Sequence, residues 1–125
     1  KKFKHEKIIL GLVHRDFKPW NVIFYKKPLF FDFEESVFDG PPLEDLFNYF
    51  IDPIIKYKSA CSIIKKINSE EKIKLFNYYL NSLNIKTDYV FLLNIYFLNR
   101  TIFYEVERNF AMSRKYSNLF FYFNK

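Results

Sequence analysis

The residues most suited to chemistry lie in one short segment of the sequence. From His14 to Asn21 it reads HRDFKPWN, which places Asp16 two residues after the histidine and five residues before the asparagine. A further aspartate, Asp32, follows the next apolar stretch. Aspartate and asparagine are common in loops, where they satisfy backbone donors, so each of these residues alone carries little weight. As an ordered set they point to a functional site.

The stretch between these residues indicates how they meet. Apart from Leu29, residues 22–25 and 29–31 are β-branched or aromatic, and residues 26–28, two lysines and a proline, separate the two runs. This pattern predicts a β-hairpin with a three-residue loop. Asn21 precedes the first strand and Asp32 follows the second. Because facing Cα atoms of antiparallel strands lie about 4.5–5.5 Å apart, we expect these two side chains to converge.

The chemistry expected of such a site involves a metal and a phosphate. A carboxylate and an amide oxygen suit Mg²⁺, which takes its other ligands from water and phosphates. Asp16, on the loop that enters the hairpin, could accept the proton of an attacking hydroxyl. Lys18 could place a positive charge beside a transferring phosphoryl group. We therefore predict Asp16 and Lys18 as catalytic residues, and Asn21 and Asp32 as ligands of the metal and, through it, of the nucleotide.

After the hairpin the period of the apolar residues changes from that of a strand to that of a helix. Residues 43–51 carry one apolar stripe at helical spacing, and Asp52 followed by Pro53 predicts that this helix kinks or restarts there. The fold class that follows is α+β, with a hairpin and a helical body.

Further along the chain, two cap signals predict where helices begin. Residues 68–71 have the spacing of a capping box, and Thr87 with Asp88 can cap a long helix that reaches about Arg108. Residues 8–13 could form one more short strand.

Composition limits the classes of protein that remain. The chain has 125 residues, half of them apolar, which is enough for one compact domain with a real core. The net charge is +6, but the lysines are spread along the chain, so we favour a solvated surface over nucleic-acid binding. A lone Cys61 fits a reducing cytoplasm. The longest apolar stretch, residues 89–97, is too short to span a bilayer. We expect a cytoplasmic protein without membrane insertion, and the oligomeric state stays open.

Three segments of the sequence resemble one known group of enzymes. Residues 12–22, LVHRDFKPWNV, resemble the catalytic loop of the protein-kinase-like fold in its aminoglycoside phosphotransferase and choline kinase branch. Residues 32–34, DFE, are similar to the metal-binding D-x-E/D pattern of that branch, and residues 40–46, GPPLEDL, resemble its G-[D/P]-P-x-x-D-L helix start. The resemblance covers residues 12–50, and beyond them only the helical character agrees.

The resemblance implies roles for five residues. Asp16 would be the catalytic base, while Asn21 and Asp32 would bind Mg²⁺ and, with it, ATP. His14 and Asp45 would support the structure of the loop, because Asp45, at the start of a helix, would accept hydrogen bonds that fix the catalytic loop. The simpler interpretation of Asp45 is a carboxylate favoured by the helix dipole.

The acceptor implied by the resemblance is a small hydroxyl compound: an amino sugar, a sugar or a choline-like alcohol. Glu105 and Glu107 could serve a cationic substrate of this kind. Both could equally be surface charges of a helix, which is the interpretation we favour.

Two features separate this sequence from protein Ser/Thr kinases. This sequence shares Arg15 and the Lys18–Pro19 pair with those kinases. The first difference is Glu34, which stands where they carry glycine. Residues 40–45 also follow too soon to leave room for a peptide-positioning segment. We therefore favour a small-molecule kinase, and the motif then assigns no role to Arg15.

The sequence lacks the parts that hold a nucleotide. Nothing before His14 supplies a glycine-rich loop or a strand lysine for the ATP phosphates, and the whole chain has two glycines. We therefore expect residues 1–125 to be a single partial domain: the C-terminal lobe of a kinase-like phosphotransferase, inactive by itself. The alternatives are a non-catalytic remnant that acts as a binding module and a fragment of a protein Ser/Thr kinase.

Overall fold

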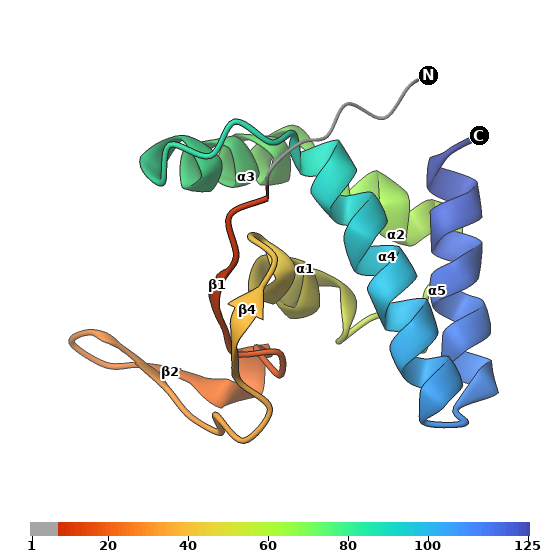
Figure 1. Ribbon diagram of the computed structural model, residues 1–125, viewed down its shortest axis with the longest axis horizontal. Coiled ribbons are helices and arrows are strands. Elements are labelled where there is room, and N and C mark those ends of the chain that lie inside the picture. Colours follow the sequence, from red (N-terminus) through yellow and green to blue (C-terminus); the bar gives the residue numbers. More distant parts are fainter. Residues whose placement is uncertain (1–7) are drawn as a thin grey trace.

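Two small antiparallel sheets stand beside a helical body in residues 8–125, the part of the chain that this computed structural model describes (Figure 1). In chain order the elements are β1 (Gly11–Val13), a 3₁₀ turn (Pro19–Asn21), β2 (Val22–Phe24), β3 (Pro28–Phe30), β4 (Val37–Gly40), α1 (Glu44–Ile51), α2 (Ala60–Ile67), α3 (Glu70–Ser82), α4 (Tyr89–Val106) and α5 (Phe110–Phe123). The mixed α+β class predicted from the sequence is confirmed.

The predicted hairpin is formed by β2 and β3, with its loop shifted by one residue. Val22 pairs with Phe30, and Phe24 pairs with Pro28. The proline was expected in the loop, but it is the first residue of β3, and Tyr25 joins the loop instead. A proline is tolerated there because the first position of a strand need not donate a hydrogen bond.

The second sheet pairs β1, the strand before the catalytic loop, with β4, the strand before α1. Of the expected strand at residues 8–13 only β1 forms, and it pairs with β4, which the sequence analysis did not predict. The two strands come very close at Gly40, where an added Cβ atom would lie 2.3 Å from Cγ2 of Val13. Glycine is therefore required at this position, and it fixes the place where the chain turns into α1.

The first helix lies where it was predicted, but its end differs. Helix α1 stops at Ile51, and no helix restarts at Pro53: the residues that follow form turns until α2, which Ser59 caps by accepting the amide N–H of Ser62 at 3.3 Å. The prediction of a kink or restart was wrong because the Asp52 carboxylate does not cap a following helix. It accepts a hydrogen bond from Arg100 on α4 instead.

Helices α3 and α4 begin at the predicted cap signals. Ser69 precedes α3 without a side-chain cap bond, so no capping box forms, whereas Asp88 accepts the amide N–H of Val90 at 2.8 Å. The end of α4 was expected near Arg108 and lies at Val106. Helix α5 then runs back along α4 (Figure 1), and none of the described helices is both long and apolar enough to cross a membrane.

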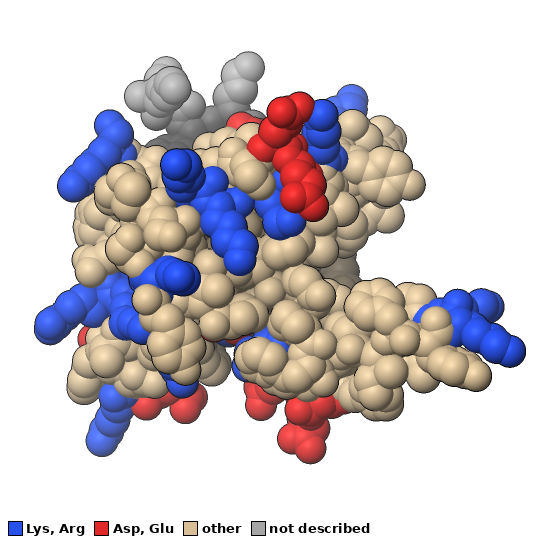
Figure 2. Space-filling model, turned by 180° about the vertical axis from the view of Figure 1, so that it is seen from behind, with Lys and Arg blue, Asp and Glu red and all other residues tan. Residues whose placement is uncertain are grey.

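The core lies among the five helices. Phe47 and Ile51 of α1 are fully buried together with Phe76 of α3 and Tyr96 and Phe97 of α4. On the face shown in Figure 2, lysine and arginine side chains are scattered between other residues and do not form one block.

Candidate active site

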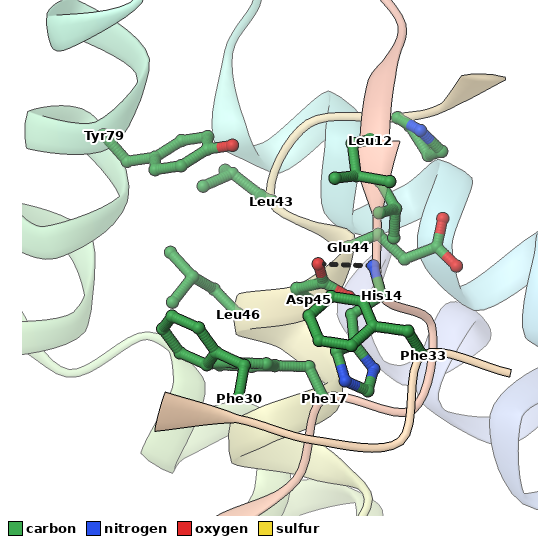
Figure 3. A pocket seen from close by; sticks show the side chains of 12 residues that line it. Leu12, His14, Phe17, Phe30, Phe33, Leu43, Glu44, Asp45, Leu46 and Tyr79 are labelled. Carbon is green, nitrogen blue, oxygen red and sulfur yellow. Dashed lines mark hydrogen bonds between the residues drawn. The ribbon is translucent and has the colours of Figure 1, made fainter. Parts of the chain in front are cut away.

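The candidate catalytic loop is tied to the start of α1. One carboxylate oxygen of Asp45 accepts the backbone N–H of His14 at 2.8 Å, and the other accepts that of Arg15 at 3.0 Å. The first of these bonds is drawn in Figure 3. Burial raises the pKa of Asp45, and the two backbone donors act against that rise. The contact expected between Asp45 and the loop is therefore present in the structure.

A second tie comes from Asn48, one helical turn further along α1. Its Nδ2 donates to the backbone carbonyl of Arg15 at 2.7 Å, and its Oδ1 accepts the hydroxyl hydrogen of Tyr96 at 2.8 Å. Asn48 is fully buried, so these bonds satisfy polar atoms that water cannot reach. The sequence analysis missed this residue. The signal was a single polar residue inside an apolar helical stripe, three positions after Asp45.

These ties hold the backbone of the loop in a strained conformation. Arg15 has φ 65°, in the left-handed region that side chains other than glycine rarely adopt. Both its amide N–H and its carbonyl are bonded to α1 side chains, from Asp45 and Asn48. The conformation persists because the helix fixes it from both sides, as expected of strain that surrounding structure compensates.

Behind Asn48 a buried polar network continues to the far side of the helical body. Arg100 of α4 pairs with Asp52 at 2.9 Å, and the Tyr116 hydroxyl donates to the same carboxylate. Burial raises the pKa of Tyr96 well above its ordinary value, so its hydroxyl stays protonated and donates to Asn48. The loop is thus connected to three helices.

Three of the predicted site residues meet on the loop itself. Nδ2 of Asn21 donates both to the backbone carbonyl of Asp16 at 2.9 Å and to its carboxylate at 3.0 Å. The Lys18 ammonium forms an ion pair with the other carboxylate oxygen of Asp16. The amide oxygen of Asn21 takes part in neither bond.

Asp32 comes two residues after the end of β3. It is exposed and has φ 60°, a left-handed conformation that aspartate adopts more readily than most residues. The backbone N–H of Phe31 donates to the carbonyl of Asn21 at 3.0 Å, which closes the open end of the hairpin beside Asp32. That Asn21 and Asp32 share one metal ion stays a prediction.

The donor set suits a magnesium ion that keeps part of its water shell. One amide oxygen and one carboxylate are hard ligands, and Mg²⁺ is commonly bound by one or two protein groups together with phosphates. Among the described residues, no three His, Cys, Asp or Glu side chains gather as a metal site. A magnesium ion held by Asn21 and Asp32 would need phosphate or water ligands as well.

His14 connects the catalytic loop to the segment that follows β3. Its ring is 4% exposed, and Nε2 lies 2.5 Å from the carbonyl oxygen of Phe31. The ring also packs against Phe33, with the ring centres 4.5 Å apart. These contacts join the catalytic loop to the segment that carries Asp32, as the predicted structural role requires.

A cavity of about 540 Å³ opens beside Asp16. Glu107 lines it, but Glu105 does not, because its carboxylate accepts the Ser113 hydroxyl on α5 at 2.7 Å. The lining also includes Phe103 and Tyr104 of α4. This cavity is where a molecule would reach the carboxylate of Asp16.

The charges in this cavity are unevenly paired. Arg15 lies 3.8 Å from the buried Glu44, whose pKa burial raises and Arg15 lowers in part. Neither Glu35 nor Glu107, which both line the cavity, forms an ion pair with another described residue. The open charges of the cavity are therefore negative.

Comparison with known protein families matches one part of the chain. Residues 9–55 match the family described as "Phosphotransferase enzyme family". The matched part includes the loop, both sheets and α1, and it ends before α2. No match was found among curated proteins or among solved structures. The resemblance of the catalytic-loop region to aminoglycoside phosphotransferases is thereby confirmed.

Proposed function

We propose, on the premise of the phosphotransferase match over residues 9–55, that this region transfers a phosphoryl group from Mg-ATP to a hydroxyl of a small molecule. One observation carries the proposal: Asp16, Lys18 and Asn21 are bonded to one another on a loop that α1 holds in place. Phosphoryl transfer depends on such positioning and on charge stabilisation more than on covalent chemistry.

Each residue then has a defined task. The Asp16 carboxylate accepts the proton of the acceptor hydroxyl. The Lys18 ammonium, already beside that carboxylate, offers positive charge to the transferred group. Asn21 and Asp32 would hold a magnesium ion, which when bound neutralises phosphate charge. Asp45 and His14 fix the loop and the end of the hairpin.

The acceptor we favour is cationic: an amino sugar or a choline-like alcohol, with neutral sugars as the less suited class. The support is the pair of carboxylates without ion-pair partners, Glu35 and Glu107, in the cavity beside Asp16. The rings of Phe103 and Tyr104 in the same lining already face the Arg100 guanidinium, 5.6 and 5.3 Å from their ring centres, so the two carboxylates alone would meet the cation of the acceptor. Arg15 would then act through Glu44, by keeping that carboxylate paired while the acceptor meets the other two.

We further propose that residues 1–125 correspond to the C-terminal lobe of a kinase-like fold. With two glycines in the chain, a glycine-rich loop over the phosphates cannot come from this sequence. The 125-residue chain alone should therefore bind ATP weakly and turn it over slowly. Robust turnover by the isolated chain would overturn this assignment.

The test of the function uses this chain joined to a nucleotide-binding lobe, with amino sugars, sugars and choline-like alcohols as acceptors. Asp16→Asn should lower kcat by about 10²–10⁴-fold and leave ATP binding nearly unchanged. Asp32→Ala should weaken the magnesium-dependent binding of ATP as well. Asp39→Asn, an exposed change on β4, is the matched control and should do neither. Full activity of Asp16→Asn with Mg-ATP bound would show that the base is misassigned.

A further inference from the structure

The cavity beside Asp16 has a neighbour on the other side of the catalytic loop. Lys18 and Tyr104 line both cavities, and the second one has a volume of about 210 Å³. Its remaining walls come from the turn before β2, the segment after α1 and the start of α5. A molecule that reaches the Asp16 carboxylate can therefore extend past these two side chains into the second cavity.

Tyr104 offers a free hydroxyl group where the two cavities meet. Its ring is fixed, because it stacks on Tyr116 with ring centres 5.7 Å apart and the Arg100 guanidinium lies 5.3 Å from its centre. The hydroxyl forms no hydrogen bond with another described residue, and it is not among the buried polar atoms, so it is accessible. Burial raises the pKa of Tyr104, so the hydroxyl keeps its hydrogen and can donate it to a ligand.

The second cavity also presents two exposed aromatic rings. Trp20, the only tryptophan of the chain, lies in the 3₁₀ turn between Lys18 and β2 and is 64% exposed. Tyr57, in the segment after α1, is 81% exposed and lines the same cavity. Cavities lined by aromatic rings with a few polar groups are typical binding sites for small molecules.

The open charge of the second cavity is opposite to that of the first. Its one carboxylate, Asp52, already accepts hydrogen bonds from Arg100 and Tyr116. Lys56 lines the cavity and forms no ion pair with another described residue. The groups left free are therefore hydrogen-bond donors, and a ligand part bound here should carry oxygen atoms and no ammonium group.

We propose that the acceptor site extends past Tyr104 and takes a molecule of two rings: an amino sugar beside Glu35 and Glu107, joined to an uncharged sugar ring that lies on Trp20. Tyr104 donates a hydrogen bond to an oxygen of the second ring. A sugar ring suits this lining because it combines a C–H face with oxygen atoms. A cavity of roughly 150 Å³ holds benzene, so the volume here admits one such ring. The place of the first ring rests on the proposed function.

The test compares three sugars on the 125-residue chain by titration calorimetry, without ATP. Glucosamine has one ring and one ammonium group, lactosamine adds an uncharged galactose ring, and the disaccharide of two glucosamines adds a charged one. Lactosamine should bind about tenfold more tightly than glucosamine, the gain expected for one hydrogen bond and a ring contact. The disaccharide of two glucosamines should gain less. The fluorescence of Trp20, the only tryptophan, should change with lactosamine and not with glucosamine.

Two variants assign the gain to residues. Trp20→Ala should remove most of the advantage of lactosamine over glucosamine. Tyr104→Phe keeps the ring on Tyr116 and should lower this advantage about threefold, the loss of one hydrogen bond. Phe38→Ala, which removes an exposed aromatic ring of β4 outside both cavities, is the matched control and should keep the full advantage. A merely structural Tyr104 would weaken both sugars alike, and an unchanged ratio in Tyr104→Phe overturns its part.

The outcomes separate this inference from the proposed function. Tighter binding of lactosamine with a change in Trp20 fluorescence supports the second ring site, whether or not phosphoryl transfer follows. Binding of glucosamine without a gain for lactosamine overturns the second ring site and leaves the proposed function standing. A larger gain for the disaccharide of two glucosamines overturns the charge assigned to the second cavity. Binding of none of the three sugars overturns both the amino-sugar acceptor and the extended site.

Discussion

The loop-and-sheet region and the helical body of this protein keep their shapes by different means. The body is held by a continuous core in which Phe47 of α1 is completely buried. In residues 11–40, by contrast, large apolar side chains such as Phe24 and Phe38 are mostly exposed, at 74% and 84%. The loop in this region is held by its hydrogen bonds to α1, where Asp45 accepts two backbone N–H groups and Asn48 donates to a carbonyl.

This contrast shows where the order of the candidate site comes from. Asp16 and Asn21 sit on a thin part of the molecule with little core of its own, yet the loop keeps a strained backbone at Arg15. That strain can persist only because the well-packed helix next to it fixes both the N–H and the carbonyl of this residue. The geometry of the candidate site thus depends on its contacts with α1 of the helical body.

The largest expected effect tests the core. Phe47→Ala should lower the free energy of unfolding by about 3–5 kcal/mol, because it opens a cavity in the middle of the packed helices. Phe24→Ala removes the same side chain from the exposed hairpin and should change stability by less than about 0.5 kcal/mol. Urea unfolding of both variants measures the difference. Similar losses in the two would remove the contrast between the regions.

The next effect tests the tie between them. Asn48→Leu leaves the Arg15 carbonyl without its partner and the Tyr96 hydroxyl with only its longer contacts to Asp52 and Tyr116, at 3.5 and 3.4 Å. It should destabilise the protein by about 1–3 kcal/mol. It should also speed amide hydrogen exchange in the loop more than in α5. Asn77→Leu, on the exposed face of α3, is the control and should do neither. A loop that exchanges as slowly as in the parent would mean that Asn48 does not hold it.

A smaller effect concerns two residues of the helical body that have positive φ. Arg108 has φ 55° directly after α4, where its N–H and that of Asn109 bond back to the helix in a Schellman motif. Arg108→Gly should raise the free energy of unfolding by roughly 0.5–1 kcal/mol, since glycine adopts this conformation freely. Asn84→Gly, also at positive φ, should gain less because asparagine tolerates it better. Thermal unfolding at one pH gives both values, and a loss of stability in Arg108→Gly would contradict the argument.

The smallest effect concerns pH and Glu44, the buried carboxylate that lies 3.8 Å from Arg15. Burial raises the pKa of Glu44 above 4.5, so in the window just above that value the folded chain binds more protons than the unfolded chain. The contribution of Glu44 to stability therefore falls as the pH rises through this window, and the cost remains at neutral pH. The difference in free energy of unfolding between Glu44→Gln and the parent, variant minus parent, should be more positive at about pH 7 than at about pH 4. Urea unfolding at both values measures it, and a difference independent of pH would mean that Arg15 fully offsets the burial.

The parts of the fold that were predictable are those that local patterns specify. The hairpin, the starts of α1 and α3 and the cap of α4 follow from runs of β-branched and aromatic residues, helical periodicity and local cap signals. The pairing of β4 with β1 was missed because it joins segments far apart in the chain, and such pairing leaves little trace in either strand alone.

The candidate site divides in the same way. The roles of Asp16 and Asn21 were predictable because one compact motif, residues 14–21, contains both, and that of Asp45 because residues 40–46 form a second motif. The partners of Asp52 lie on α4 and α5, more than forty residues away, and those of Asn48 are Tyr96 on α4 and the Arg15 carbonyl on the loop. No local pattern therefore shows that these two side chains serve a buried network. The local pattern at Asp52 instead favoured a helix cap, which the contact with Arg100 displaced.

The hydrogen bonds that hold the loop also constrain the order in which the chain can fold. Asp45 reaches back 31 residues to His14, and Asn48 is satisfied only when Tyr96, 48 residues further on, arrives with α4. Contacts this distant form after local helices do, because the intervening chain must first be closed into a loop. During synthesis the segment from His14 to Asn21 therefore leaves the ribosome long before its final shape is available. We expect the loop to acquire that shape only after α1 has formed, and the bond between Asn48 and Tyr96 to follow when α4 docks on α1.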